Sequence, residues 1–465
     1  MTTRPRSSAP PAAPPAGRPR LLYLLPLLIA ASTLWPLAAL AEDADWPSFR
    51  GRDARGVVEG VTLPTTWNVE SGANVRWKTE IPGLGHSSPV VWGDRVFLTT
   101  AVRAEGEESL KVGLYGDIQP VNDDSPHSFQ VMALDRASGK VLWTRTAHQG
   151  VPEVKRHTKA SHANSTPATD GKHLVAMFGS EGLHCYDLDG ELLWSKDFGV
   201  LDSGFFMVPT AQWGFASSPL IHEGKVYVQA DVQGQSFLAA FDVATGEQVW
   251  RTERDEVPTW SSPAIAPRGD GWQVVVNGYK HIGGYDAETG AELWKISGGG
   301  DIPVPTPIVA GDLILITSAH GRERPIYAIR TSATGEITVD SEAMAWHQEK
   351  AGNYMQTPIV VGDLAYFGFD NGVISVYEWK TGERLYQERL GGGQTGFTSS
   401  PVAGAGKVYF TSEVGDTYVL AHGRELELLA TNELGETFMS TPAIAGDQIL
   451  FRARHHLYAI GNQED

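Results

Sequence analysis

The chain has 465 residues, of which 42% are hydrophobic and 20% are charged, a composition typical of a folded soluble protein rather than a disordered or polytopic membrane chain. Its 37 Lys and Arg residues against 55 Asp and Glu residues give a net charge of -18, which excludes a general nucleic-acid surface because such a surface must neutralise phosphates. The single cysteine, Cys185, excludes an intrachain disulfide, a Cys-x-x-Cys-His haem site and an iron–sulfur cluster held by this chain alone.

Residues 1–41 have the pattern of an export signal peptide. Residues 1–20 contain four arginines and no acidic residue, residues 21–40 are apolar, and the run ends in Ala39-Leu40-Ala41. An uncleaved membrane anchor is the alternative, but Pro26 and Pro36 inside the apolar run favour a signal peptide. We therefore expect an exported protein in an envelope compartment such as the periplasm.

Residues 82–465 contain one motif eight times, a Ser/Thr-Pro pair followed by a short apolar run. Successive pairs are 41 to 78 residues apart, a spacing typical of stacked units of four short strands. The pairs are Ser88-Pro89, Thr166-Pro167, Ser218-Pro219, Ser262-Pro263, Thr306-Pro307, Thr357-Pro358, Ser400-Pro401 and Thr441-Pro442.

Within a unit, the apolar run leads through a Gly-Asp or Gly-Lys turn to an alternating strand, and a third strand ends in a second turn. This second turn recurs at residues 133–139, 240–246 and 284–290, where its Asp accepts backbone N–H groups and its Gly provides a positive φ. A fourth, outer strand follows, whose large aromatic ring is expected to wedge between adjacent sheets. The positions with this role are Trp143, Trp194, Trp250, Trp294, Trp346 and Tyr386, with a weaker Leu428 in the seventh unit.

The eighth unit ends after its third strand, at Tyr458-Ala459-Ile460, whereas residues 42–81 contain a spare strand at Val75-Arg76-Trp77-Lys78. We expect the N-terminal strand to complete the last unit, which removes the open edge that a repeat array otherwise exposes. The predicted fold is therefore an all-β, eight-bladed β-propeller of four-stranded antiparallel blades.

The recurring Ala-x-Asp-x-x-Thr/Ser-Gly-x-x-x-Trp element resembles the tryptophan docking motif of the PQQ-like β-propeller repeat superfamily, over residues 75–460. The opening residues 45–51, Asp-Trp-Pro-Ser-Phe-Arg-Gly, are similar to those of exported bacterial PQQ-binding-like repeat proteins. The superfamily includes quinoprotein alcohol dehydrogenases and BamB-like outer-membrane assembly factors, so the resemblance implies the fold and leaves two functions open.

Each of these two functions has features that this sequence lacks. The quinoprotein enzymes imply adjacent disulfide-bonded cysteines, a Ca²⁺ held by Glu, Asn and Asp, and an Asp base, but Cys185 stands alone. The acidic and amide residues between second and third strands are interpreted as turn formers rather than a metal site; they are Glu181, Asp231, Asp370, Asn371, Glu413 and Asp416. The lipidation cysteine of BamB is also missing after the apolar run.

Residues 155–164, the basic loop, reverse the sign of an acidic chain immediately before Ser165-Thr166-Pro167. Their candidate binding residues are Lys155, Arg156, His157, Lys159 and His162. Such a loop suits an anion such as a carboxylated quinone, a phosphate or an acidic glycan, and a solvated charged loop is the alternative. Because His157 and His162 have no acidic neighbour in sequence, no metal site is predicted.

Other candidate binding residues lie in loops that should gather at one face of the ring. Trp213 and Trp260 fall outside the outer-strand series, so either they stack on a planar ligand or they pack against neighbours in the channel. Lys280, His281 and His320, the last with Arg322 and Arg324, are further candidates, as are Tyr279, Tyr354, Gln356 and residues 452–456. No catalytic residue is predicted.

Residues 103–127 form a polar insertion in the first unit, which explains its long spacing. Loops of this length are usually functional or disordered. We expect the insertion to lie over one face as a lid or a partner-docking arm.

The leading functional prediction is a BamB-like binding or scaffold protein of the bacterial envelope, without catalysis and with an envelope protein as partner. The alternative is a PQQ- and Ca²⁺-dependent oxidoreductase for alcohols or sugars, in which the basic loop takes the cofactor carboxylates and Trp213 or Trp260 stacks on it. A carbohydrate- or sulfate-ester-binding propeller is a third possibility. Membrane association is expected only through an uncleaved signal or a partner.

Overall fold

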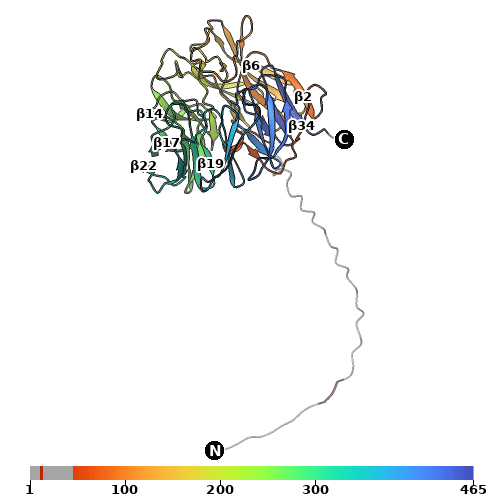
Figure 1. Ribbon diagram of the computed structural model, residues 1–465, viewed down its shortest axis with the longest axis vertical. Helices are drawn as coiled ribbons and strands as arrows, with labels where there is room; N and C mark the ends of the chain where they lie inside the picture. Colours follow the sequence, from red (N-terminus) through yellow and green to blue (C-terminus); the bar gives the residue numbers. More distant parts are fainter. Residues whose placement is uncertain (1–10, 14–44, 464–465) are drawn as a thin grey trace, which may run out of the picture. The chain divides into compact units, whose positions relative to one another are not determined.

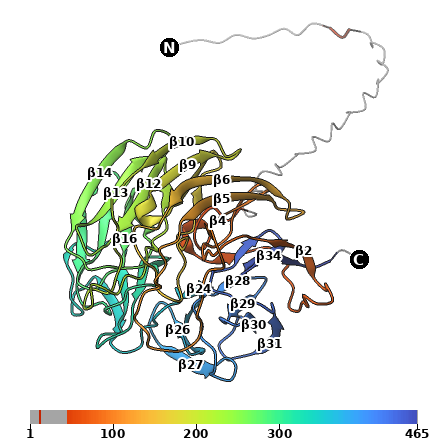
Figure 2. The same cartoon turned by 90° about the horizontal axis from the view of Figure 1, so that it is seen from above.

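The strands of this chain form a ring of sheets, as the repeats predict. The computed structural model describes residues 11–13 and 45–463, and residues 45–463 contain eight sheets with four antiparallel strands each, which confirms the eight-bladed propeller (Figures 1 and 2). Apart from residues 11–13, the predicted signal peptide lies outside the described residues. The helical elements among the described residues are two 3₁₀ turns, Arg52–Ala54 and Gly179–Glu181, and none of the described helices has the length and apolarity to cross a membrane.

The blades follow each other in chain order, and each runs from its innermost to its outermost strand. Blade 1 consists of β3 (Val90–Trp92), β4 (Arg95–Arg103), β5 (His127–Asp135) and β6 (Val141–Gly150), and blade 2 of β7 (Ala168–Thr169), β8 (His173–Met177), β9 (Leu183–Asp187) and β10 (Leu192–Lys196). Blade 3 consists of β11 (Leu220–His222), β12 (Lys225–Ala230), β13 (Ser236–Asp242) and β14 (Gln248–Arg254), and blade 4 of β15 (Ala264–Arg268), β16 (Gly271–Val276), β17 (Ile282–Asp286) and β18 (Glu292–Ile296).

Blade 5 consists of β19 (Ile308–Ala310), β20 (Leu313–Thr317), β21 (Ile326–Arg330) and β23 (Met344–Gln348), and blade 6 of β24 (Ile359–Val361), β25 (Leu364–Gly368), β26 (Val373–Glu378) and β27 (Arg384–Arg389). Blade 7 consists of β28 (Val402–Gly404), β29 (Lys407–Thr411), β30 (Asp416–Ala421) and β31 (Leu428–Glu433), and blade 8 of β32 (Ala443–Ala445), β33 (Gln448–Arg452), β34 (His456–Gly461) and β2 (Val75–Glu80). Two short strands add parallel pairings, β1 (Val57–Val58) on β28 and β22 (Gly335–Glu336) on β18.

The N-terminal strand closes the ring. β2 pairs antiparallel with β34, so that Trp77 stands opposite Ala459, and Figure 2 shows the two strands side by side. Blade 8 therefore joins the two ends of the described chain, which confirms the predicted closure. No edge of β34 is left open for pairing with another molecule.

The Ser/Thr of each Ser/Thr-Pro pair forms part of a ring of hydroxyl groups around the channel. Each of these eight Ser or Thr residues faces its counterpart in the next blade. In seven of the eight pairs of neighbours, all within the described residues, the backbone N–H of one Ser or Thr donates to the hydroxyl oxygen of the next. With N···O distances of 2.9 to 3.2 Å, the links run from Ser88 to Thr166, Thr166 to Ser218, Ser218 to Ser262, Thr306 to Thr357, Thr357 to Ser400, Ser400 to Thr441 and Thr441 to Ser88. A hydroxyl is needed at this position because these buried N–H groups require an acceptor.

The outer strands are fastened to the next blade by their tryptophans. The Trp194 indole N–H of blade 2 donates to the carbonyl oxygen of Val243 in the blade 3 turn (2.9 Å). A Cβ on Gly246 would lie 2.6 Å from the Trp194 ring, and Gly246 has a φ of +69°, which favours glycine. Both the space and the backbone conformation therefore require glycine in this turn. The equivalent indole bonds join Trp77 to Arg136, Trp143 to Leu188, Trp250 to Ala287 and Trp346 to Trp379.

Two of the predicted outer-strand positions depart from this docking geometry. Trp294 is fully buried, but its indole donates to Gln273 of its own blade (2.8 Å), because blade 5 has a longer turn whose strand β22 pairs with β18. Leu428 lies on the outer strand β31 and is 50% exposed, so it does not wedge between blades.

Residues 45–58, the N-terminal segment, plug the channel. Arg50 is fully buried and donates to the carbonyl oxygens of Pro358 and Pro401, both at 2.9 Å. These prolines directly follow ring residues Thr357 and Ser400, so Arg50 lies one residue further along the innermost strands than the hydroxyl ring. Burial lowers the pKa of Arg50 to about 9. Phe49 beside it faces the channel cavity.

Candidate functional site

A cavity of about 620 Å³ occupies the channel, within the size range of small-molecule sites. All eight residues of the hydroxyl ring line the cavity, together with residues of the loops that precede the innermost strands. Phe49 of the N-terminal segment lines it as well. Residues 113–118 of the insertion also line it. The propeller thus encloses a site to which most of its blades contribute.

The insertion, residues 104–126 between β4 and β5, lies along the basic loop and across part of the cavity. The Val121 N–H donates to the carbonyl oxygen of Arg156 (2.8 Å), and the Lys111 N–H donates to that of Thr158 (3.0 Å). Its tip crosses toward blade 7, where the Gly113 N–H donates to Glu413 Oε2 (2.6 Å). The insertion therefore links blades 1, 2 and 7 over the cavity.

Aromatic side chains form one wall of the cavity. The rings of Trp213 and Phe205 are stacked, with centroids 5.2 Å apart and planes 3° apart, and Trp260 lies 5.4 Å from Trp213. The Trp213 indole N–H donates to the Ile118 carbonyl oxygen of the insertion (3.0 Å), and the Trp260 indole N–H donates to that of Gly214 (3.1 Å). Both indoles are thus held in place by the chain, and their centroid separation leaves no room for a third ring between them.

The cations of the basic loop are mostly engaged within the protein. Arg156 is fully buried and pairs with Glu108 (2.8 Å), and Lys155 donates to Asn122 (2.5 Å), so neither side chain lines the cavity. Lys159 lines the cavity but pairs with Glu413 (2.5 Å). His157 also lines the cavity, and its Nε2 lies 2.8 Å from the Asp117 carbonyl oxygen. The basic loop therefore uses its charged side chains largely to bind the insertion, through Glu108, Asn122 and the Gly113 carbonyl oxygen.

Two cations at the rim of the cavity are unengaged. Arg324 and Lys350 are exposed, line the cavity and form a backbone bridge with each other. Within the described residues, neither side chain has a hydrogen bond or an ion pair. Sequence reasoning noted Arg324 and missed Lys350, because only the pairing of β21 with β23 brings the two together.

Of the remaining candidates, one lines the cavity and two do not. His320 lines the cavity, where its Nδ1 lies 2.6 Å from Asp301 Oδ1 and its ring lies 5.7 Å from that of Tyr354. Lys280 and His281 do not line it: Lys280 is exposed and pairs with Asp255, and His281 Nε2 lies 2.5 Å from Glu292 Oε2.

Burial shifts the protonation of two groups that face the cavity. Burial and the nearby Arg452 lower the pKa of His86 to about 3, so its ring is neutral and its Nε2–H donates to the Lys159 carbonyl oxygen (2.9 Å). Burial raises the pKa of Asp370, although Lys159 opposes the shift. Asp370 and Asp117 are the carboxylates among the lining residues.

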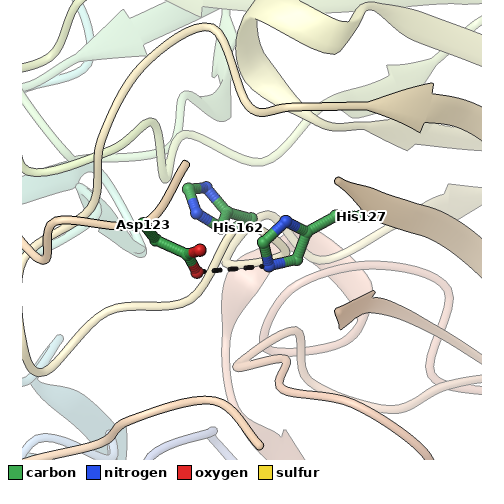
Figure 3. Close-up of side chains that lie close together, drawn as sticks. All are labelled: Asp123, His127 and His162. Atoms are coloured by element: carbon green, nitrogen blue, oxygen red, sulfur yellow. Dashed lines mark ion pairs between the residues drawn. The ribbon is translucent and has the colours of Figure 1, made fainter. Parts of the chain in front are cut away.

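A buried polar cluster under the insertion was not predicted. Asp123, His127 and His162 place one ligand atom each within 4.8 Å of one another (Figure 3), and Glu108 contacts His127. Burial opposes protonation of His127, but its hydrogen bond to Glu108 raises its pKa; burial and Arg156 lower the pKa of His162 to about 3. The residues are up to 54 positions apart, so no sequence spacing signals the cluster.

Comparison with known proteins identifies the family. The family profile described as "Outer membrane protein assembly factor BamB" matches residues 127–268 and 235–464, well over half of the chain. The chain belongs to this family. It is 23% identical to BamB of Shewanella oneidensis over 67% of this chain and 75% of that protein, and 21% identical to BamB of Yersinia pestis over 46% of this chain and 54% of that protein. The chain thus spans between about half and three quarters of these relatives.

Other members of this group of folds include enzymes. A tetrathionate hydrolase of Acidithiobacillus ferrooxidans is 22% identical over 62% of this chain and 51% of that protein. Among solved structures, BamB from Moraxella catarrhalis has a TM-score of 0.52 at 14% identity, covering 78% of this chain and 99% of that chain. Quinohemoprotein alcohol dehydrogenase from Comamonas testosteroni has a TM-score of 0.60 at 12% identity, covering 92% and 82%. At these identities the structural likeness shows the PQQ-like propeller fold alone.

Proposed function

We propose that this protein is an exported binding protein of the bacterial envelope, and that the covered cavity is its recognition site for a planar, anionic small molecule. The observation that carries the proposal is an aromatic-walled cavity of about 620 Å³ with two unengaged cations at its rim. Its volume and lining fit a small-molecule site.

The chemistry of the lining sets the ligand class. The faces of Trp260 and Tyr354 offer flat apolar surface, which favours a planar ring system. Arg324 and Lys350 can donate charge-assisted hydrogen bonds to a ligand without breaking a contact within the protein. They therefore favour a ligand that carries carboxylate or phosphate groups. This assignment moves anion recognition from the basic loop to the rim of blade 5.

Binding is favoured over catalysis because most titratable groups of the cavity are already engaged. Lys159 is neutralised by Glu413, and both ring nitrogens of His157 are hydrogen-bonded to backbone groups. A general base or nucleophile has to be free to exchange protons with a substrate, which these contacts oppose.

One observation favours a second candidate, a PQQ-dependent oxidoreductase. Asp370 faces the cavity with a raised pKa, as a general base often does. The cavity fits the planar, acidic part of PQQ but not a calcium ion beside it: Asp117 and Asp370 are its lining carboxylates, and the Asn164 amide is occupied by Ser161 and Phe215. Cys185 is buried in a hydrophobic core and supplies no disulfide.

Export and an envelope partner rest on the signal-like N-terminus and on the family. Relatives named as outer membrane protein assembly factors support a role beside other envelope proteins. In our proposal the small ligand and the partner use different surfaces, because the insertion crosses part of the cavity.

The test is a fluorescence titration of the purified protein with planar carboxylates, including PQQ, with and without Ca²⁺. We expect saturable quenching of Trp213 and Trp260 by at least one of these compounds. Replacing Arg324 and Lys350 together by Ala should weaken binding at least about tenfold, since charge-assisted hydrogen bonds contribute about 1.5–3 kcal/mol each. The matched control is Arg322→Ala, an exposed residue of the same loop that does not line the cavity, which should leave affinity unchanged.

Each outcome separates the candidates. Absence of quenching by every compound, or equal affinity of the double variant and Arg322→Ala, contradicts the proposed site. Ca²⁺-dependent binding with reduction of an electron-accepting dye, lost in Asp370→Asn, replaces the binding protein by the oxidoreductase.

A further inference from the structure

The end of the insertion, the start of β5 and the basic loop bring metal-binding side chains together beneath the insertion. Asp123 comes from the insertion, His127 begins β5, and His162 comes from the basic loop, and their ligand atoms lie within 4.8 Å of one another (Figure 3). Two imidazoles and a carboxylate are a donor set of zinc and other first-row transition metals.

Each donor is oriented by a second contact. His127 Nδ1–H donates to the Ser125 carbonyl oxygen (2.8 Å), which turns Nε2 toward Asp123 Oδ2 at 3.4 Å. Asp123 Oδ1 accepts the Ser125 N–H (3.2 Å) and faces Arg103, so Oδ2 is left for the cluster. Metal-binding histidines typically donate their other ring N–H to a carbonyl or a carboxylate in this way.

Glu108 lies beside this group and contacts one of its members, His127. Its Oε2 accepts a hydrogen bond from Arg156 (2.8 Å), while Oε1 contacts His127 Nε2. Glu108 and Asp123 are both buried, and each has one oxygen held by an arginine and one oxygen facing His127. Because the arginines offset the carboxylate charge, the cluster favours an ion that binds imidazole nitrogen strongly over Mg²⁺ or Ca²⁺.

His162 distinguishes a metal site from an ion pair. A protonated His127 between Glu108 and Asp123 would account for those three residues. It would leave His162 Nε2, a buried atom without a hydrogen-bond partner among the described residues, unexplained. Such an atom in a native structure calls for an unseen water or ion. A metal ion held by Asp123, His127 and His162, whose donor atoms lie within 4.8 Å of one another, satisfies it.

We propose that Asp123, His127 and His162 form a Zn²⁺ site, with Glu108 beside it, that fastens the insertion to the ring over the cavity. The ligands come from the insertion, from β5 and from the basic loop, so the ion would join the insertion to blade 1 and to the loop that precedes blade 2. The proposal does not depend on which molecule the cavity binds.

The test is metal binding by the purified full chain. After dialysis against a chelator, Zn²⁺ titration by calorimetry should show one tight site per chain, and Co²⁺ should give the visible absorption of a tetrahedral complex. His162→Gln should weaken Zn²⁺ binding at least about tenfold. Because Lys111 in the insertion is exposed, Zn²⁺ should slow tryptic cleavage there in the wild type and not in the variant.

His148→Gln is the matched control, because His148 also packs against Phe129 but lies outside the cluster. It should keep wild-type Zn²⁺ affinity. Asp123→Asn supplies an independent ligand variant in case His162→Gln misfolds. The proposal is overturned if the wild type takes up neither ion, or if all three variants bind Zn²⁺ as the wild type does. A ring of His127 that stays doubly protonated in ¹⁵N spectra with Zn²⁺ present would also overturn it.

Discussion

Some buried arginines of this ring pair with carboxylates, as Arg156 does with Glu108, and others are satisfied by backbone carbonyls. Arg50 holds two proline carbonyls, and Arg452, whose pKa burial lowers to about 9, donates to the Ser87 hydroxyl and to the Thr99 carbonyl oxygen. Burying a charge costs free energy unless such partners are present. Glu181 is different, because its carboxylate accepts a hydrogen bond from the Glu153 N–H (3.0 Å) and has no cation beside it among the described residues.

Glu181 makes a pH-dependent contribution to stability. Burial raises its pKa from 4.5 to about 7, so the folded protein holds a proton that the unfolded chain releases near pH 4.5. The free energy of unfolding should therefore be unaffected by this group below pH 4.5 and should fall as the pH rises from 4.5 through 7. Glu181→Gln should be more stable than the wild type by about 1–2 kcal/mol at pH 8 and equal to it at pH 4.

Denaturant unfolding at both pH values checks this expectation. Glu247→Gln, at an exposed position on the outside of blade 3, is the control and should change stability at neither pH. A Glu181→Gln variant that is destabilised at pH 8 would show that the ionised carboxylate is needed in the folded state.

At the scale of the strands, the hydroxyl ring holds each innermost strand to the next. Thr357→Val keeps the shape of the side chain but removes the acceptor of the buried Thr306 N–H, so we expect a loss of about 1–3 kcal/mol in the free energy of unfolding. Thr306→Val is a matched control, because the link from Ser262 to Thr306 is not among the seven hydrogen-bonded ones. Denaturant unfolding of both variants measures the difference, and equal losses would mean that the hydroxyls act through packing alone.

Element by element, the sequence predicted what depends on local contacts. The turn glycines, the Trp194 type of docking residue and the spare strand around Trp77 each have a short-range signature, because the same turn is formed in every blade. The role of the Ser/Thr before each proline was not predicted, because its partner is always one blade away.

The site was predicted less well than the fold, since its residues meet only when the ring is complete. Of the basic loop, His157 and Lys159 reach the cavity, while Arg156 is drawn inward by Glu108, 48 positions earlier in the chain. Lys159 meets Glu413 across 254 positions. No periodicity in the sequence encodes such pairings.

For the whole molecule, closure by β2 predicts the behaviour of a truncated chain. A protein lacking residues 45–81 loses β2 and the Arg50 plug, so the edge of β34 is open for pairing with other molecules. We expect it to form oligomers in size-exclusion chromatography with light scattering, and addition of a peptide of residues 45–81 should restore a monodisperse species. A chain lacking only residues 1–44 is the control. A truncated protein that remains monomeric with unchanged thermal unfolding would contradict the role of β2.

The pairing of β2 with β34 also imposes an order on biosynthesis. Residues 75–80 emerge from the ribosome early, but their partners at residues 456–460 come almost four hundred positions later. Until then the N-terminal strand has no sheet to join and blade 8 cannot form, so the ring cannot close during synthesis. A chain that cannot finish folding while it is being made stays unfolded until its last strand appears, which is compatible with the export that we propose.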